Sequence, residues 1–392
     1  MTIREYFEKY PISENESKSA YFRRLSELSN NILQPKSFSS HYYKKGKQKS
    51  KSLKQYDFDR KERVLKSQLA EQKALYKKAL EDLDESEKRL DTLLNIKSHK
   101  PKLKIEVTQD SELHDAVPIL VFSDWHVEET VSSESVSGLN EFNTDVADLR
   151  IKTLFNRSRK LIQHLQTYFN ISQVYVLLNG DMISGYIHEE LRETNSLSPT
   201  QAIRFAKERI IAGLNYLEKE LDVDKIIVQC NYGNHGRSTK ERRHSETAYK
   251  NSYEWLMYHD IADYYENNKK FNFHIAHSLI SYYTFMHDNR QFTLRTWHGD
   301  NVRFQGGIGG LTIPLNKLIY RLDQNKQADY NIIGHFHTLF EANKKCLVNG
   351  SVIGYNAYAH DLGLEYEGPK QGLLLLDLNR MEIRSKYTIN CD

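Results

Sequence analysis

Cysteine and long apolar runs are scarce in this sequence of 392 residues. Its three cysteines, Cys230, Cys346 and Cys391, are odd in number and widely spaced, which argues against a framework of structural disulfides. No apolar run approaches the roughly 20 residues that a membrane-spanning helix needs. The first ten residues, MTIREYFEKY, carry charges where a signal peptide would have its apolar segment. We therefore expect a cytoplasmic protein that does not span a membrane.

Negative charge is missing from residues 36–56. The net charge of +3 is too small to indicate a partner, but residues 36–56 contain seven lysines and no acidic residue. Aromatic residues lie among these lysines, and this mixture suits phosphate neutralisation with base stacking. We expect Lys44, Lys45 and Lys47 to contact DNA. The same composition is also typical of a solvated linker.

Residues 1–100 form the first part of the predicted organisation. Residues 1–56 read as a small helical, lysine-rich region, either a DNA-binding head or an ordinary helical cap. Residues 57–97 are almost free of glycine and proline, which predicts one long helix within a segment 57–100. Apolar residues repeat along it in two heptad positions, at Leu69, Tyr76, Leu83 and Leu90 and at Leu80 and Leu94. Because Lys73 and Glu87 interrupt this seam, a homodimeric coiled coil through 57–97 competes with packing on the domain that follows.

From residue 101 to 392 the pattern changes to that of a single domain. Short apolar runs at 117–122, 173–178 and 225–230 alternate with amphipathic helical segments near 145–169, 200–220 and 245–265. Strands that alternate with helices are typical of an α/β fold with crossover connections.

Polar residues follow five apolar runs at the point where each run ends. The residues are Asp124 and His126 in SDWH, Asp181 in NGD, Asn234 in NYGNH, His298 after QFTLRTW, and His335 and His337 in GHFH. Ligand sites of open α/β sheets gather at the carboxyl ends of strands. In an extended strand end, residues i and i+2 point to the same side, so Asp124 could face one ion together with His126, and the alternating His335 and His337 could do so too.

These donors indicate a dinuclear metal site. Seven side chains exceed what one ion of four to six ligands needs, whereas two ions that share Asp181 would use them all. Nitrogen and oxygen donors without cysteine favour Mn²⁺, Fe or Zn²⁺ over Mg²⁺. We expect two divalent metal ions, with Mn²⁺ as the activating ion.

The ordered set D-x-H, G-D, G-N-H, H and G-H-x-H resembles the calcineurin-like metallophosphoesterase superfamily over roughly residues 117–351, including VNGS at 348–351. The resemblance implies a four-layer α/β/β/α sandwich and phosphoester hydrolysis by a metal-activated hydroxide. It places Asp124, His126 and His337 on one metal, Asp181 as the bridge, and Asn234, His298 and His335 on the other.

The resemblance also implies that His235 is a catalytic residue beside the scissile phosphate, where it stabilises charge or protonates the leaving oxygen. The family commonly has an acidic residue after this histidine, whereas Gly236 follows it here. Arg237 is a candidate phosphate contact, with a structural arginine as the alternative. His188 could lean into the site or could begin a helix.

The substrate is inferred from three features: the long helix, the basic segment with its aromatics, and a motif set similar to that of SbcD-like DNA repair nucleases. We expect a phosphodiesterase that hydrolyses DNA. A phosphodiesterase or phosphatase for small nucleotides is the first alternative, and a catalytically weak DNA-binding scaffold is the second. A catalytic domain usually begins nearer the N-terminus in the SbcD-like branch, so the sequence identifies no protein partner.

Overall fold

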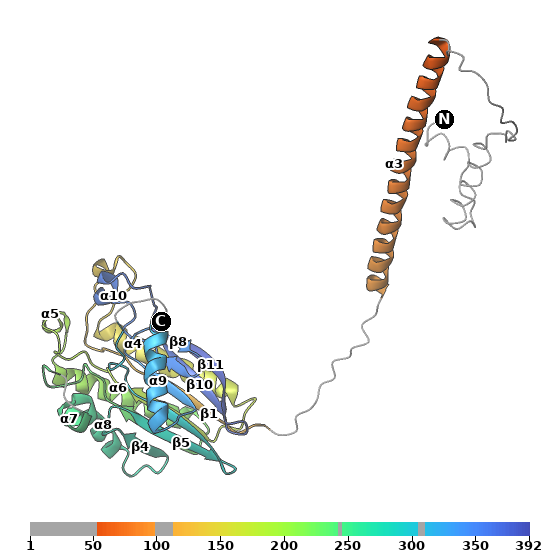
Figure 1. The fold of residues 1–392 in the computed structure, drawn as a ribbon. Coiled ribbons are helices and arrows are strands. Elements are labelled where there is room, and N and C mark those ends of the chain that lie inside the picture. Colours follow the sequence, from red (N-terminus) through yellow and green to blue (C-terminus); the bar gives the residue numbers. More distant parts are fainter. Residues whose placement is uncertain (1–52, 99–112, 242–244, 305–309) are drawn as a thin grey trace. The chain divides into compact units, whose positions relative to one another are not determined.

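The computed structural model describes residues 53–98, 113–241, 245–304 and 310–392, and Figure 1 shows its elements. It divides into two compact units, Met1–Val107 and Thr108–Asp392. The first contains helix α3, Leu53–Ser98, so the long helix expected from the sequence is present. Most of segment 1–56, including Lys44, Lys45 and Lys47, lies outside the described residues.

The second unit holds two β-sheets and the helices that cover them. Its strands are β1 (Ala116–Phe122), β2 (Gln173–Asn179), β3 (Lys225–Asn231), β4 (Phe271–Ile275), β5 (Ser281–His287), β6 (Arg290–Thr296), β7 (Tyr330–Ile333), β8 (Phe340–Ala342), β9 (Cys346–Val348), β10 (Lys370–Asp377) and β11 (Glu382–Asn390). Its helices are η1 (Glu134–Val136), α4 (Thr144–Leu165), α5 (Leu191–Thr194), α6 (Pro199–Glu220), α7 (Ser245–Ala248), η2 (Tyr249–Asn251), α8 (Tyr253–Tyr264), α9 (Thr312–Asn325) and α10 (Ala357–Asp361).

The larger sheet has the order β11-β10-β1-β2-β3-β4, in which β1 to β4 run parallel. The smaller sheet has the order β5-β6-β7-β9-β8, in which β6, β7 and β9 run parallel. Parallel strands covered on both faces read as continuous apolar runs, and β1 is buried along its whole length. The strand signal in the sequence therefore comes from burial on two sides.

Three apolar clusters fill the spaces between the layers. Alternate residues of β1 point to opposite faces of the sheet: Leu120 packs toward α4 and α6, and Ile119 packs toward the second sheet. A third cluster joins the second sheet, through Ile333, to Leu315 of α9. The predicted α/β/β/α sandwich is confirmed.

Local capping explains where the helices begin. The side chain of Asn143 accepts hydrogen bonds from the N–H groups of Asp145 and Val146 at the start of α4. The single helix expected near 245–265 is instead divided into α7, η2 and α8. The division falls at Ser252, whose extended backbone and hydroxyl cap α8. Among the described residues, the structure contains no helix with both the length and the apolar character of a membrane span.

Candidate metal centre

Two groups of metal-type side chains lie at the carboxyl ends of the central strands. One contains Asp124, His126 and His337, and the other contains Asp181, His298 and His335; within each group the ligand atoms lie within 4.8 Å of one another. The parallel strands β1 and β2 deliver the first members of the two groups to the same edge of the larger sheet. The second sheet supplies three histidines: His298 follows strand β6, and His335 and His337 follow strand β7. The structure thus brings six of the seven predicted ligands into two clusters.

Backbone hydrogen bonds connect the loops that carry these groups. The N–H of Trp125 donates to the carbonyl of Asp181 over 2.8 Å, and the N–H of His335 donates to Asp124 Oδ1 over 3.0 Å. The N–H of His235 donates to Asp181 Oδ1 over 2.8 Å. These hydrogen bonds therefore join the loops after β1, β2, β3 and β7 to one another.

Five of the predicted ligand residues have left-handed backbone conformations. Their φ angles are 55° for Asp124, 49° for His126, 52° for Asp181, 71° for His335 and 53° for His337. Residues other than glycine seldom adopt this region, and strained backbone of this kind clusters at functional sites. The expectation of an extended strand end at Asp124 and His126 is wrong: β1 stops at Phe122 and tight turns aim the side chains.

Hydrogen bonds at the far side of each ring orient two of the imidazoles. His298 Nδ1 lies 2.9 Å from the carbonyl oxygen of Asn179, so Nδ1 donates and Nε2 faces Asp181 Oδ2 at 2.7 Å. His126 Nδ1 lies 2.9 Å from Ser184 Oγ, which leaves His126 Nε2 to face His337 Nε2 at 3.2 Å. In a metal-binding histidine, the N–H of the other ring nitrogen commonly donates a hydrogen bond to a neighbour in this way.

The pKa values reflect burial and the close pairing of charges. Burial would raise the pKa of Asp181, but attraction to His298 and His235 holds it well below its ordinary value. Burial would lower the pKa of His298, but Asp181 raises it well above its ordinary value. Burial, and then repulsion from other histidines, lowers the pKa of His126 well below its ordinary value and that of His335 to about 4. Neutral imidazole, which His126 and His335 hold at pH 7, is the form that binds a metal.

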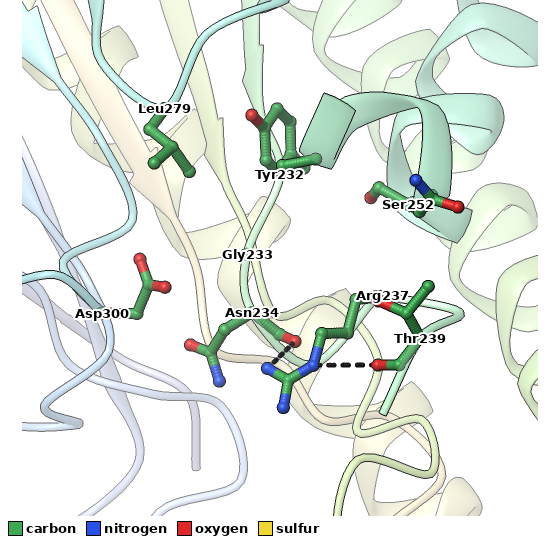
Figure 2. Close-up of a pocket in the computed structure, with 10 residues that line it drawn as sticks. Tyr232, Gly233, Asn234, Arg237, Thr239, Ser252, Leu279 and Asp300 are labelled. Carbon is green, nitrogen blue, oxygen red and sulfur yellow. Dashed lines mark hydrogen bonds between the residues drawn. The ribbon is translucent and has the colours of Figure 1, made fainter. Parts of the chain in front are cut away.

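Asn234, the seventh predicted ligand, lies after β3 at the same sheet edge. Its Oδ1 atom is buried and has no hydrogen-bond partner among the described residues. Figure 2 shows Asn234 beside Arg237 in a small pocket that Asp300 also lines, with a cavity of about 30 Å³. The negative charge of Asp300 acts to raise the pKa of His298 and His335, which puts this carboxylate close to the second group. Sequence reasoning missed Asp300, although it follows His298 by two residues.

His235 lies next to both groups. Its ring is 4.8 Å from that of His126 and 6.0 Å from that of His188, measured between ring centroids. Its Nδ1 atom lies 2.9 Å from the carbonyl oxygen of Ser184, which fixes Nδ1 as the donor. A backbone carbonyl therefore orients this ring, and the exposed His188 side chain lies beside it.

Two fully buried glutamates support the site and were missed by the sequence analysis. Glu254 of α8 accepts the N–H of Met182 over 2.5 Å and that of Gly233 over 2.7 Å. Burial, and then repulsion from Asp181, raises the pKa of Glu254 to about 8. Glu128 accepts the N–H groups of residues 184 and 185 through Oε1, and burial raises its pKa to about 7.

Arg237 has mainly neighbours from its own loop. Its guanidinium donates to the carbonyl oxygens of Asn234, Thr239 and Lys240 over 3.1 to 3.2 Å. These bonds give Arg237 a role in holding the loop after Asn234, and a phosphate contact stays a prediction.

The donor set fits a pair of divalent cations. Carboxylate, amide and imidazole donors converge from five strand ends, and the buried Oδ1 of Asn234 lacks a protein partner among the described residues. Buried polar atoms in native proteins are normally hydrogen-bonded, and a bound cation would give this oxygen a partner.

No family model and no curated protein matches this chain. Solved structures give remote similarities. The sulfate thiohydrolase SoxB of Thermus thermophilus is 10% identical, with a TM-score of 0.27, over 74% of this chain and 57% of its own length. A phosphatase of Mycoplasma pneumoniae is 13% identical, with a TM-score of 0.28, over 71% of this chain and 94% of its own length. A serine/threonine phosphatase of Saccharomyces cerevisiae is 11% identical, with a TM-score of 0.27, over 72% of this chain and 81% of its own length. Similarity this remote leaves the function to be argued from the site.

Proposed function

We propose that the protein is a dinuclear-metal-dependent phosphodiesterase that hydrolyses DNA. The observation that carries the proposal is the pair of donor groups joined through Asp181. One oxygen of this carboxylate lies 2.7 Å from His298 Nε2, and the other accepts the N–H of His235. The N–H groups of Trp125 and His126, from the loop of the other group, donate to the main-chain carbonyl of Asp181. Because the two loops meet at Asp181, its carboxylate is suited to a position between two ions.

Two divalent cations would neutralise the phosphate charge and lower the pKa of an attacking water. Asp124, His126 and His337 would hold one ion, and Asn234, His298 and His335 would hold the other, with Asp181 shared. We propose Mn²⁺ as the activating ion, because the carboxylate and amide oxygens suit Mn²⁺ and the imidazoles argue against Mg²⁺.

His235 is proposed to act on the leaving group. The Ser184 carbonyl accepts the proton of its Nδ1, so the other nitrogen, Nε2, is available to carry a proton. In that position His235 could stabilise negative charge on the phosphate or give a proton to the leaving oxygen. The neighbouring His188 would contact the substrate rather than a metal.

DNA as the substrate is supported by the charge of residues 36–56. Seven lysines without an acidic residue can neutralise successive phosphates, and the interleaved aromatics can stack on bases. Lys44, Lys45 and Lys47 lie at the centre of this segment. A small-nucleotide phosphodiesterase would have no need of such a segment.

The test is cleavage of end-labelled linear and circular DNA, single- and double-stranded, by metal-stripped protein resupplied with Mn²⁺. We expect cleavage that Asp181→Ala abolishes and that removal of residues 1–56 weakens. Hydrolysis of a small chromogenic diester without cleavage of any DNA would replace the nuclease proposal with the small-nucleotide alternative. If the metal-loaded wild-type protein neither cleaves DNA nor hydrolyses the small diester, the proposal of phosphodiester hydrolysis is overturned.

A further inference from the structure

Three aromatic side chains form a cluster beside the candidate metal centre. The rings of Tyr249 and His277 stack with 5.1 Å between centroids and 10° between planes. Trp255 lies against both, with its ring centroid 5.3 Å from that of Tyr249 and 5.9 Å from that of His277. We refer to Tyr249, Trp255 and His277 as the aromatic shelf.

Backbone hydrogen bonds attach the shelf to the loop that carries Asn234 and His235. The N–H of Tyr253 donates to the carbonyl of Gly236 over 2.8 Å, and the N–H of Ser238 donates to the carbonyl of Asn251 over 2.8 Å. Tyr249 precedes this attachment and Trp255 follows it. The segment that holds these two rings is thus fixed to the loop after β3.

The third ring reaches the same place from the sheet. Strand β4 pairs with β3 in parallel, and the N–H of Ala276 donates to the carbonyl of Cys230 over 2.9 Å. His277 therefore emerges at the carboxyl end of β4, next to the end of β3 from which Asn234 follows. Two separate segments converge on one side of the candidate metal centre.

The pocket around Asn234 is lined by chain neighbours of the shelf residues. Ala248, Asn251 and Ser252, which flank Tyr249, line this pocket, and so does Leu279, two residues after His277. Figure 2 shows Leu279 and Ser252 on opposite sides of the pocket, with Asn234 below them. The shelf residues therefore neighbour the pocket that contains Asn234.

The shelf is open to solvent rather than part of the core. His277 is exposed, and Tyr249 and Trp255 are half-buried. Lys250 places its Nζ atom 5.7 Å from the centroid of the Tyr249 ring. Flat rings with one accessible side and a neighbouring cation are what base stacking beside a phosphate requires.

We propose that the aromatic shelf stacks the base of the nucleotide whose phosphate is hydrolysed. This proposal rests on the proposed function, because the metal centre positions the phosphate that carries the base. The ligand is a nucleobase attached to a phosphodiester, in DNA or in a mononucleotide diester. Exposed His277 provides the outer surface, and Tyr249 and Trp255 support it from behind.

The first measurement compares two chromogenic diesters on the full-length, Mn²⁺-loaded protein. One is thymidine 5′-(p-nitrophenyl phosphate), and the other is methyl p-nitrophenyl phosphate, which has no base. We expect Tyr249→Ala and His277→Ala to lower kcat/KM for the thymidine ester about 5- to 100-fold, mainly through KM. The same variants should leave the methyl ester unchanged within about twofold. If the ratio of kcat/KM for the two esters is the same in these variants as in wild type, base stacking on the shelf is overturned.

Tyr168→Ala is the matched control, since Tyr168 is an exposed tyrosine that lies after α4. The chain runs from α4 into the start of β2, so Tyr168 lies at the sheet edge opposite to the metal centre. This variant should preserve kcat/KM for both esters. A loss in Tyr168→Ala equal to that in His277→Ala would show a general effect and count against the shelf.

The second measurement separates the shelf from the catalytic proposal. Binding of fluorescein-labelled dT₁₂ to metal-stripped protein is followed by fluorescence anisotropy, together with competition by thymidine 5′-monophosphate. Weaker dT₁₂ binding by the shelf variants supports the shelf even if neither ester is hydrolysed. Equal binding by wild type and shelf variants overturns it. Competition by the mononucleotide at similar concentrations identifies a single-nucleotide ligand, and its absence identifies a DNA strand.

Discussion

The carboxyl group of Glu254 occupies the space that a side chain at position 236 would need. A Cβ atom on Gly236 would lie 2.6 Å from Glu254 Cγ and 2.8 Å from its Cδ. The acidic residue expected directly after His235 is absent, and a carboxyl group from α8 lies there instead. Its two oxygens accept the N–H groups of Met182 and Gly233, next to Asp181 and Asn234. Glu254 therefore joins the loops of two proposed ligands.

Replacement of Glu254 by glutamine should weaken metal binding. A carboxyl oxygen keeps a lone pair for a backbone N–H even when it is protonated, whereas an amide nitrogen does not. One N–H would lose its partner and the two loops would separate. We expect Mn²⁺ affinity about 10- to 100-fold lower by calorimetric titration of metal-stripped Glu254→Gln.

The control for that substitution is Glu266→Gln, at an exposed position just after α8. It should bind Mn²⁺ as wild type does. A folded Glu254→Gln protein with unaltered Mn²⁺ affinity would show that Glu254 does not support the metal centre.

His235→Ala should separate catalysis from metal binding. The hydrogen bond from His235 to Asp181 comes from the main-chain N–H, and alanine keeps that group. We expect the variant to bind Mn²⁺ with wild-type stoichiometry and to lose a factor of about 10² to 10⁴ in kcat for a chromogenic diester. Metal content and turnover would be measured on the same preparation, and full turnover would refute the role given to His235.

The donor residues of the site could be predicted from the sequence because each one follows a buried strand. Burial on both faces makes those strands easy to recognise, and parallel strands bring their carboxyl ends to one edge. The left-handed turns at Asp124, His126 and Asp181 could not be predicted, because nothing in these residue types requires a positive φ. Neither could Glu254, since a glutamate in the first turn of an amphipathic helix is usually solvated.

Helix α3 should mediate dimer formation. Its leucines lie exposed along one heptad seam, with Leu69 56%, Leu83 48% and Leu90 57% accessible. Burial of such a seam against a second copy would stabilise a coiled coil. Light scattering coupled to size exclusion should give twice the chain mass of 46.0 kDa for wild type and the single mass for Leu83→Asp.

Ser67→Asp, on α3 but away from that seam, should remain dimeric. A single-chain mass for the wild-type protein at micromolar concentration would eliminate the coiled coil.

Asp377 lies at the sheet edge opposite to the metal centre, and its carboxylate should make folding stability depend on pH. It pairs with Ala116 at the start of β1, and its carboxylate lies 2.8 Å from Arg384 and 2.9 Å from His114. Burial opposes ionisation, but His114 and then Arg384 lower the pKa of Asp377 below its ordinary value. The stabilisation is complete above the unfolded pKa of about 3.9 and is lost as the pH falls through the lower folded value.

Asp377→Asn should therefore lower the free energy of unfolding at pH 7 by about 1–2 kcal/mol, with the difference shrinking below about pH 4. Urea unfolding across this pH range would measure it. The exposed Asp361→Asn serves as the control and should change stability by less than about 0.5 kcal/mol. A deficit in Asp377→Asn that does not depend on pH would contradict the charge pairing.

The central claim is a two-ion hydrolytic site bridged by Asp181, and its most direct test is turnover as a function of bound metal. Metal-stripped protein would be titrated with Mn²⁺ while bound ions per chain and hydrolysis of bis(p-nitrophenyl) phosphate are measured together. We expect little turnover with one ion, full turnover with two, and neither the second ion nor turnover in Asp181→Ala. Two bound ions without hydrolysis, or full hydrolysis in Asp181→Ala, would contradict it.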